Sequence, residues 1–187
     1  MTTTSSSTEA SRLISLLLER SVTRGDFVLA SGRKSSYYID ARRTTMSGEG
    51  QLLIGRLGLA ALDQKGWAPR AVGGLTLGAD PVAYAVAYAA RAAGRSIDAF
   101  TVRKEAKGHG LGRRIEGCLT AGDTVVVVED VITTGHSALE AVAQVRQAGA
   151  QVLGVLAVVD REEGGREAIA ATGVPAIALV LASALLV

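Results

Sequence analysis

The stretch "VVVVEDVITTGHSALEAV", residues 125–142, begins with four valines. Two acids, a small polar run and a helical pattern follow them. The valines, 125–128, are typical of a buried strand because β-branched side chains pack well on a pleated sheet. Glu129 and Asp130 come directly after them. In a parallel sheet, ligands bind beyond the carboxyl ends of the strands, so two acids at this position indicate a functional site.

The polar run "TTGHS", residues 133–137, lies between this strand and a predicted helix over 137–148. A tight turn here would point successive backbone N–H groups inward at the start of the helix, where the helix dipole adds roughly half a positive charge. Gly149 suits the end of that helix. The pattern therefore predicts a cradle for a phosphate group.

The two acids need a different partner, because Glu129 and Asp130 would repel a phosphate that touched them. A pair of sugar hydroxyls is the obvious candidate, since hydroxyls donate hydrogen bonds that carboxylates accept. Two acceptors beside a phosphate loop predict a site for a ribose 5-phosphate. The alternative is an acidic strand end followed by an ordinary Ser/Thr helix cap, which is a common arrangement.

The rest of the chain after residue 70 alternates short apolar runs with Ala-rich helical stretches. Strands are predicted at 71–75, 97–102, 124–130, 152–160 and 176–182, and helices at 80–93, 137–148 and 165–171. Strands separated by helices in this order predict right-handed crossovers and a parallel sheet with helices on both faces. The fold class is therefore α/β.

The N-terminal part has a different pattern, with helices predicted over 11–20 and 51–63. Between them, residues 24–43 alternate apolar and polar side chains as a hairpin does, with its turn at Ser31 and Gly32. We name the small N-terminal region 9–45 the hood.

One domain is expected for the whole chain, 1–187, because 187 residues lie near the usual domain size. Residues 1–8 are predicted to be a flexible tail and 46–187 to be the core.

Charge and cysteine content limit the possible partners. A formal net charge of +2 is too small for a general nucleic-acid binder. Cys118 is the only cysteine, so no internal disulfide can form, which fits a reducing compartment. We expect the Cys118 side chain to be buried. The apolar segment 174–187 has 14 residues, whereas a membrane-spanning helix needs about 20. We expect a cytoplasmic protein with no membrane contact.

A second motif, "RKEAKGHGLGRR" at 103–114, gathers six basic side chains and one acid. Its three glycines disfavour a helix and predict a mobile loop that can close over an anion. Donors on such a loop could stabilise a pyrophosphate leaving group as its bond breaks. A solvated charged loop is the alternative.

These motifs resemble sequence segments of two known protein families. Residues 125–137 closely resemble the phosphoribosyl-diphosphate signature of type I phosphoribosyltransferases. The segment "RKEAKGHG", 103–110, resembles the loop of orotate phosphoribosyltransferases, and 31–43 and 158–165 resemble two further segments of that family. The resemblance implies transfer of phosphoribosyl from phosphoribosyl diphosphate to orotate, with Mg²⁺ on the diphosphate, in a homodimer with shared active sites.

The resemblance also implies a set of site residues. Those for phosphoribosyl diphosphate are Arg103, Lys104, Lys107, His109, Glu129, Asp130, Val131, Ile132, Thr133, Thr134, Gly135, His136 and Ser137. Those for orotate are Thr133, Arg161, Tyr38 and Ile39, and those with catalytic roles are Lys107, His109 and Asp130. No protein metal site is expected. On sequence alone, Tyr37 and Tyr38 fit a core position better than a ligand contact.

Two positions depart from the family pattern, because Ala30 and Leu77 stand where many members carry lysine. Diphosphate binding must then depend more on residues 103–109 and on backbone groups at 73–79. Two alternatives remain open: a purine phosphoribosyltransferase, and a regulator of the same fold that senses phosphoribosyl diphosphate without chemistry.

Overall fold

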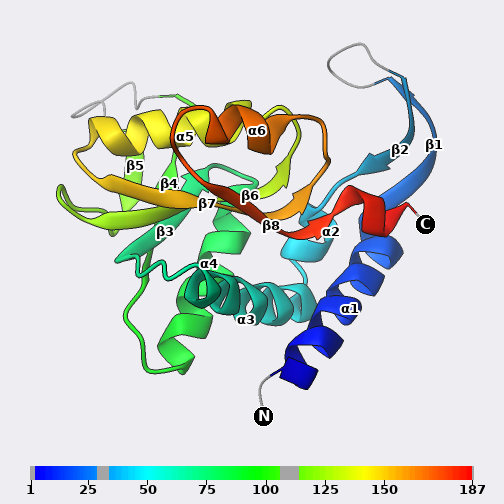
Figure 1. Cartoon of the computed structure of the whole chain (residues 1–187), viewed down its shortest axis with the longest axis horizontal. Coiled ribbons are helices and arrows are strands. Elements are labelled where there is room, and N and C mark those ends of the chain that lie inside the picture. Colours follow the sequence, from blue (N-terminus) through cyan, green and yellow to red (C-terminus); the bar gives the residue numbers. More distant parts are fainter. Residues whose placement is uncertain (1–2, 29–33, 106–113, 187) are drawn as a thin grey trace.

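The computed structural model describes residues 3–28, 34–105 and 114–186 of the chain. A six-stranded sheet forms its centre, in the order β5-β4-β3-β6-β7-β8 (Figure 1). The strands are β3 (Ala71–Leu75), β4 (Asp98–Val102), β5 (Ile115–Gly117), β6 (Thr124–Ile132), β7 (Gln151–Asp160) and β8 (Ala176–Leu181). All neighbours pair in parallel except β4 and β5. The predicted parallel sheet is confirmed, and the antiparallel edge strand β5 was missed.

Helices cover both faces of the sheet, as predicted. α3 (Gly48–Gln64) and α4 (Ala79–Ala92) lie on one face, and α5 (His136–Gln147) and α6 (Gly165–Ala170) on the other (Figure 1). The valines of β6 alternate between the two cores: Val126 and Val128 belong to the α3/α4 side, Val125 and Val127 to the other. All four are fully buried, which is why the run reads as continuously apolar.

The hood contains α1 (Thr3–Arg20), an antiparallel hairpin of β1 (Val22–Val28) and β2 (Lys34–Ile39), and α2 (Arg42–Thr45). The hairpin is confirmed, although its predicted turn at Ser31 and Gly32 lies outside the described residues. Residues 3–8, which were predicted to belong to the tail, are helical and form the first part of α1. Leu13, Leu16 and Leu17 are fully buried in the core, and such tertiary packing supports a helix whose Ser/Thr-rich first turns have only modest propensity.

Two further expectations change. β6 extends two residues past its predicted end at 130, because Val131 and Ile132 also belong to the strand and pair with β7, so Glu129 and Asp130 lie within the strand and not at its last residues. Cys118 is exposed, because it follows the edge strand β5 and not a central one.

The apolar C-terminal segment forms β8 and a short 3₁₀ helix, η1 (Ala182–Leu185), that contacts α1. Among the described residues, no helix has both the length and the apolar character needed to cross a membrane.

Candidate active site

A cavity of about 350 Å³ opens where the carboxyl ends of β3, β6 and β7 face the hood. Its volume lies at the lower end of the range usual for small-molecule sites. Its lining includes nine residues that the sequence predicted for the site: Tyr38, Ile39, Lys104, Glu129, Asp130, Val131, Thr133, Ser137 and Arg161. The α/β topology therefore brings the predicted segments to one place.

The two acids of β6 are removed from water in this cavity. Burial raises the pKa of Glu129 well above its usual value, and the neighbouring Asp130 raises it further. Burial also raises the pKa of Asp130, whose Oδ1 accepts a hydrogen bond from the Val131 N–H at 2.8 Å. Glu129 Oε2 is buried with no hydrogen-bond partner in the described structure. An unpaired buried carboxylate oxygen is costly, so it is poised to accept hydrogen bonds from a ligand.

Close backbone approach shapes the wall beside Asp130. A Cβ atom added at Gly78 would lie 2.5 Å from Asp130 Oδ1. Gly78 follows Thr76 and Leu77, which are joined by a cis peptide bond and also line the cavity. A side chain at this position would therefore force the Asp130 carboxylate to move.

A smaller cavity of about 80 Å³ adjoins the first and is lined by the predicted phosphate loop, including Ile132, Thr134, Gly135 and His136. Gly135 precedes α5 with φ of 81°, and a Cβ there would lie 2.8 Å from the Gly165 carbonyl oxygen. No side chain caps the start of α5. Because the first N–H groups of a helix lack intrahelical acceptors, they and the helix dipole form an anion site.

The two cavities share part of their lining, namely Glu129, Val131, Thr133 and Ser137. A ligand with a phosphate at one end can therefore occupy the small cavity and extend along the two acids into the larger one. This is the arrangement that the sequence predicted for a ribose 5-phosphate.

Arg161 lies on the turn after β7 and is only 8% exposed. Its Nη2 lies 2.9 Å from Glu163 Oε1, and its Cζ lies 5.0 Å from the centre of the Tyr37 ring. Its Nε has no hydrogen-bond partner in the described part of the chain. Tyr37 thus lies under Arg161, whereas Tyr38 and Ile39 line the cavity. A buried guanidinium with a donor to spare is suited to a carboxylate ligand.

Sequence reasoning missed Asp40 and Arg42, which also line the cavity. Arg42 Nε donates to Asp40 Oδ1 at 2.8 Å; this bond raises the pKa of Arg42, and the charge of Asp130 adds to the rise. The signal was present in "IDARR", where opposite charges follow directly after the hairpin strand, but the electrostatic effect of Asp130 on Arg42 joins residues far apart in the sequence and has no local pattern.

Some predicted residues lie elsewhere. Arg103 does not line the cavity, and its Nη1 lies 3.7 Å from Glu116 Oε1 on the edge strand. Lys107 and His109 fall outside the described residues, so their predicted roles stay predictions.

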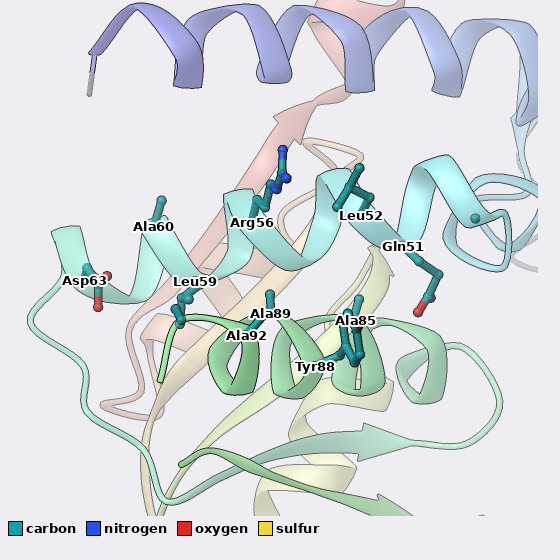
Figure 2. Close-up of a pocket in the computed structure, with 12 residues that line it drawn as sticks. Gln51, Leu52, Arg56, Leu59, Ala60, Asp63, Ala85, Tyr88, Ala89 and Ala92 are labelled. Carbon is teal, nitrogen blue, oxygen red and sulfur yellow. The ribbon is translucent and has the colours of Figure 1, made fainter. Parts of the chain in front are cut away.

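A larger cavity, of about 770 Å³, is a groove between α3 and α4 (Figure 2). Its walls are mainly apolar, with Leu52, Leu59 and Tyr88 among them. Its charged residues, Arg56 and Asp63, form ion pairs with Glu9 and Arg95. Because no desolvated charge converges on it, we assign the functional site to the smaller polar cavity.

Known proteins share this fold and sequence. The family described as "Phosphoribosyl transferase domain" matches residues 52–174. The orotate phosphoribosyltransferase of Aquifex aeolicus (strain VF5) is 49% identical over 181 residues, which cover 95% of this chain and 98% of that protein. That of Mycobacterium avium (strain 104) is 53% identical over 167 residues, covering 89% and 90%.

Solved structures agree. The orotate phosphoribosyltransferase of Mycobacterium tuberculosis H37Rv in complex with Fe(III) dicitrate is 46% identical with a TM-score of 0.86, covering 96% of this chain and 99% of that one. The same enzyme in complex with 5-phospho-alpha-D-ribosyl 1-diphosphate is 40% identical with a TM-score of 0.78, covering 95% and 92%. Fold and site together define a phosphoribosyltransferase. The chain belongs, within the type I phosphoribosyltransferases, to the orotate phosphoribosyltransferase family.

Proposed function

We propose that this protein transfers the 5-phosphoribosyl group of phosphoribosyl diphosphate to orotate, giving orotidine 5′-monophosphate and pyrophosphate in pyrimidine biosynthesis. The observation that carries the proposal is the pair of partly or fully desolvated acids on β6, beside the uncapped start of α5 and in the same cavity as a buried arginine. A sugar phosphate and an anionic acceptor are the ligands that such a site suits.

The donor substrate occupies both polar cavities in this proposal. The 5′-phosphate accepts hydrogen bonds from the backbone amides of residues 133–137, and the ribose hydroxyls donate to Glu129 and Asp130. As the bond to the leaving group breaks, the sugar gains cationic character, which the carboxylates stabilise electrostatically. Asp130 is therefore assigned a catalytic role, and no covalent enzyme nucleophile is required.

The acceptor lies between the hood and the turn after β7. Arg161 binds the orotate carboxylate, Thr133 supplies a hydroxyl, and Tyr38 and Ile39 lie against the pyrimidine ring. Tyr38 is 43% exposed at the cavity edge, which leaves room for a planar ring to cover it. The free Arg161 donor supports this assignment, since it needs an acceptor.

Basic residues and Mg²⁺ neutralise the leaving diphosphate. Lys104 lines the cavity, and we assign the same role to Arg103, Lys107 and His109. The ion, when bound, supplies a positive charge on the diphosphate oxygens. Mg²⁺ usually takes one or two carboxylates with phosphate oxygens and water. The unpartnered Glu129 oxygen fits that need, and the described residues include no group of three or more ligating side chains, so most ligands must come from substrate and water.

We also propose a homodimer with shared active sites. On the α3/α4 side, the exposed Leu52 and Tyr88 line the groove and the exposed Tyr84 lies on α4, and Leu77, which lines the polar cavity, is also exposed. Exposed apolar side chains of this kind favour an interface, and a second copy that covered Leu77 would lie beside the active site. Tyr88→Glu should lower the mass measured by light scattering to that of one chain; an unchanged mass would exclude this face.

A cytoplasmic location is proposed as well. The chain has one cysteine, and that cysteine, Cys118, is exposed, which suits a reducing compartment.

An ultraviolet assay of orotate tests the proposed reaction. Orotate absorbance should fall only when phosphoribosyl diphosphate and Mg²⁺ are both present, with pyrophosphate formed in equal amount. Adenine and hypoxanthine serve as competing acceptors, and their consumption in place of orotate would support a purine phosphoribosyltransferase. Tight binding of the donor without turnover of any acceptor would identify a regulator.

A further inference from the structure

The turn after β7, residues 160–163, is held in an unusual conformation. Glu162 has φ of 57° and is the only non-glycine residue in the described ranges with a positive φ. Its N–H donates to Asp160 Oδ1 at 2.9 Å, and the Arg161 N–H donates to the Ile132 carbonyl at the end of β6, also at 2.9 Å. A strained residue of this kind persists only where its surroundings fix it, and such residues cluster at ligand sites.

The turn is also anchored from the C-terminal end of the chain. The Glu162 carboxylate accepts a hydrogen bond from the Ser183 N–H at 2.7 Å, and this bond lowers the pKa of Glu162. Ser183 belongs to η1, which contacts α1. The chain therefore reverses at Glu162 with support on both sides, and Glu163 reaches back to Arg161.

The Arg161 guanidinium is restrained on one edge and on one face. Glu163 pairs with Nη2 at 2.9 Å, and the two side chains are only 6% and 14% exposed. Arg161 Cζ lies over the ring of Tyr37, from the hood strand β2, at 5.0 Å from the ring centre. A buried pair of this kind contributes little net stability because both ions lose water. The geometry of the Arg161–Glu163 pair, however, removes side-chain rotations that an unpaired arginine would have.

We infer that Glu163 is a positioning residue for Arg161, set by the strained turn to hold the guanidinium so that its remaining donors face an acceptor's carboxylate. The inference rests on the proposed function, in which Arg161 binds that carboxylate. Restraint before binding removes an entropy cost that binding would otherwise carry. A neutral acceptor would leave the guanidinium donors unmet, so the held arginine also selects against it.

The first test compares Glu163→Ala and Glu163→Gln with the parent enzyme. Loss of the acceptor atom should raise the KM for orotate about tenfold, since a hydrogen bond to a charged group is lost, while the KM for phosphoribosyl diphosphate stays within about twofold. Glutamine keeps an oxygen acceptor and should restore part of the loss. Glu167→Ala removes an exposed acid from the neighbouring helix α6 and serves as the matched control, with no change expected.

The second test separates positioning from a direct role. If Glu163 acts through Arg161, Glu163→Ala should change the orotate KM little in an Arg161→Lys background, so that the two effects are not additive. Additive effects would overturn the inference, as would equal effects on both substrates' KM values. Circular dichroism checks folding, and the glutamine variant carries the test if the alanine variant unfolds.

Arg161→Ala distinguishes the two levels of the account. If it raises the orotate KM and Glu163→Ala does not, the inference fails and the proposed function stands. If Arg161→Ala leaves the orotate KM unchanged, both the assignment of Arg161 and the inference that rests on it fail.

Discussion

The two main cavities differ in size and in chemistry. The groove between α3 and α4 has about twice the volume of the cavity at the strand ends, yet its charged residues, Arg56 and Asp63, are exposed and form ion pairs with Glu9 and Arg95. The smaller cavity contains a buried acid, Glu129, and a buried arginine, Arg161, each with an unmet hydrogen-bonding atom, beside the half-buried Asp130. Volume therefore marks a surface suited to apolar contact, whereas desolvated polar groups mark the place where chemistry can occur.

The largest effect that this comparison predicts comes from Asp130→Asn. Removing the charge beside the sugar should lower kcat/KM about 100- to 1000-fold, the range typical for loss of one electrostatic contact to a transition state. Asp63→Asn makes the same chemical change in the other cavity and should leave kcat/KM unchanged. Steady-state rates at saturating orotate measure both. Equal losses in the two variants would remove the distinction between the cavities.

Gly135→Ala should have the next largest effect. The new Cβ would lie 2.8 Å from the Gly165 oxygen in a left-handed conformation, which costs roughly 1–2 kcal/mol before the clash is counted. The KM for phosphoribosyl diphosphate should rise at least tenfold. Gly66→Ala has the same backbone strain at φ of 66° with open space around it, so it should destabilise the protein without changing that KM. A normal KM in Gly135→Ala would exclude the phosphate loop.

Glu129→Gln should stabilise the ligand-free protein at neutral pH. Because burial raises the folded pKa of Glu129, its stabilising contribution is complete below its usual value of 4.5 and is lost as pH rises through the raised value. The neutral variant avoids that loss and should gain about 1–3 kcal/mol near pH 8, with no gain near pH 4.5. Urea unfolding at fixed protein concentration measures the difference. A variant less stable than its parent at pH 8 would contradict the burial of an unpaired acid.

The smallest effect is expected from Asp63→Asn on stability. Its ion pair with Arg95 joins side chains that are 58% and 32% exposed, and exposed pairs contribute about 0–1 kcal/mol. The midpoint temperature of thermal unfolding should therefore fall by at most a few degrees. A larger loss of stability would show that the charged rim of the apolar groove contributes to the folded state beyond what an exposed ion pair does.

These differences also explain what the sequence could predict. Residues 125–137 encode strand, acids, loop and helix locally, so fold class and phosphate loop followed from periodicity and glycine placement. The charge of Asp130 acts on Arg42 across the fold, and the strained Glu162 aligns Glu163 with Arg161. The first effect has no short-range pattern, because it depends on tertiary packing of the hood against β6, and the second depends on a backbone conformation at Glu162 that no residue pattern indicates. The helix before residue 9 was missed for the same reason, since packing of later leucines supports it.

A crystal structure with orotidine 5′-monophosphate tests the central claim most directly. The account predicts the phosphate on the amides of residues 133–137, both ribose hydroxyls on Glu129 and Asp130, and the orotate carboxylate on Arg161. A nucleotide bound in the α3/α4 groove, or bound at the strand ends with its phosphate away from that loop, would contradict it.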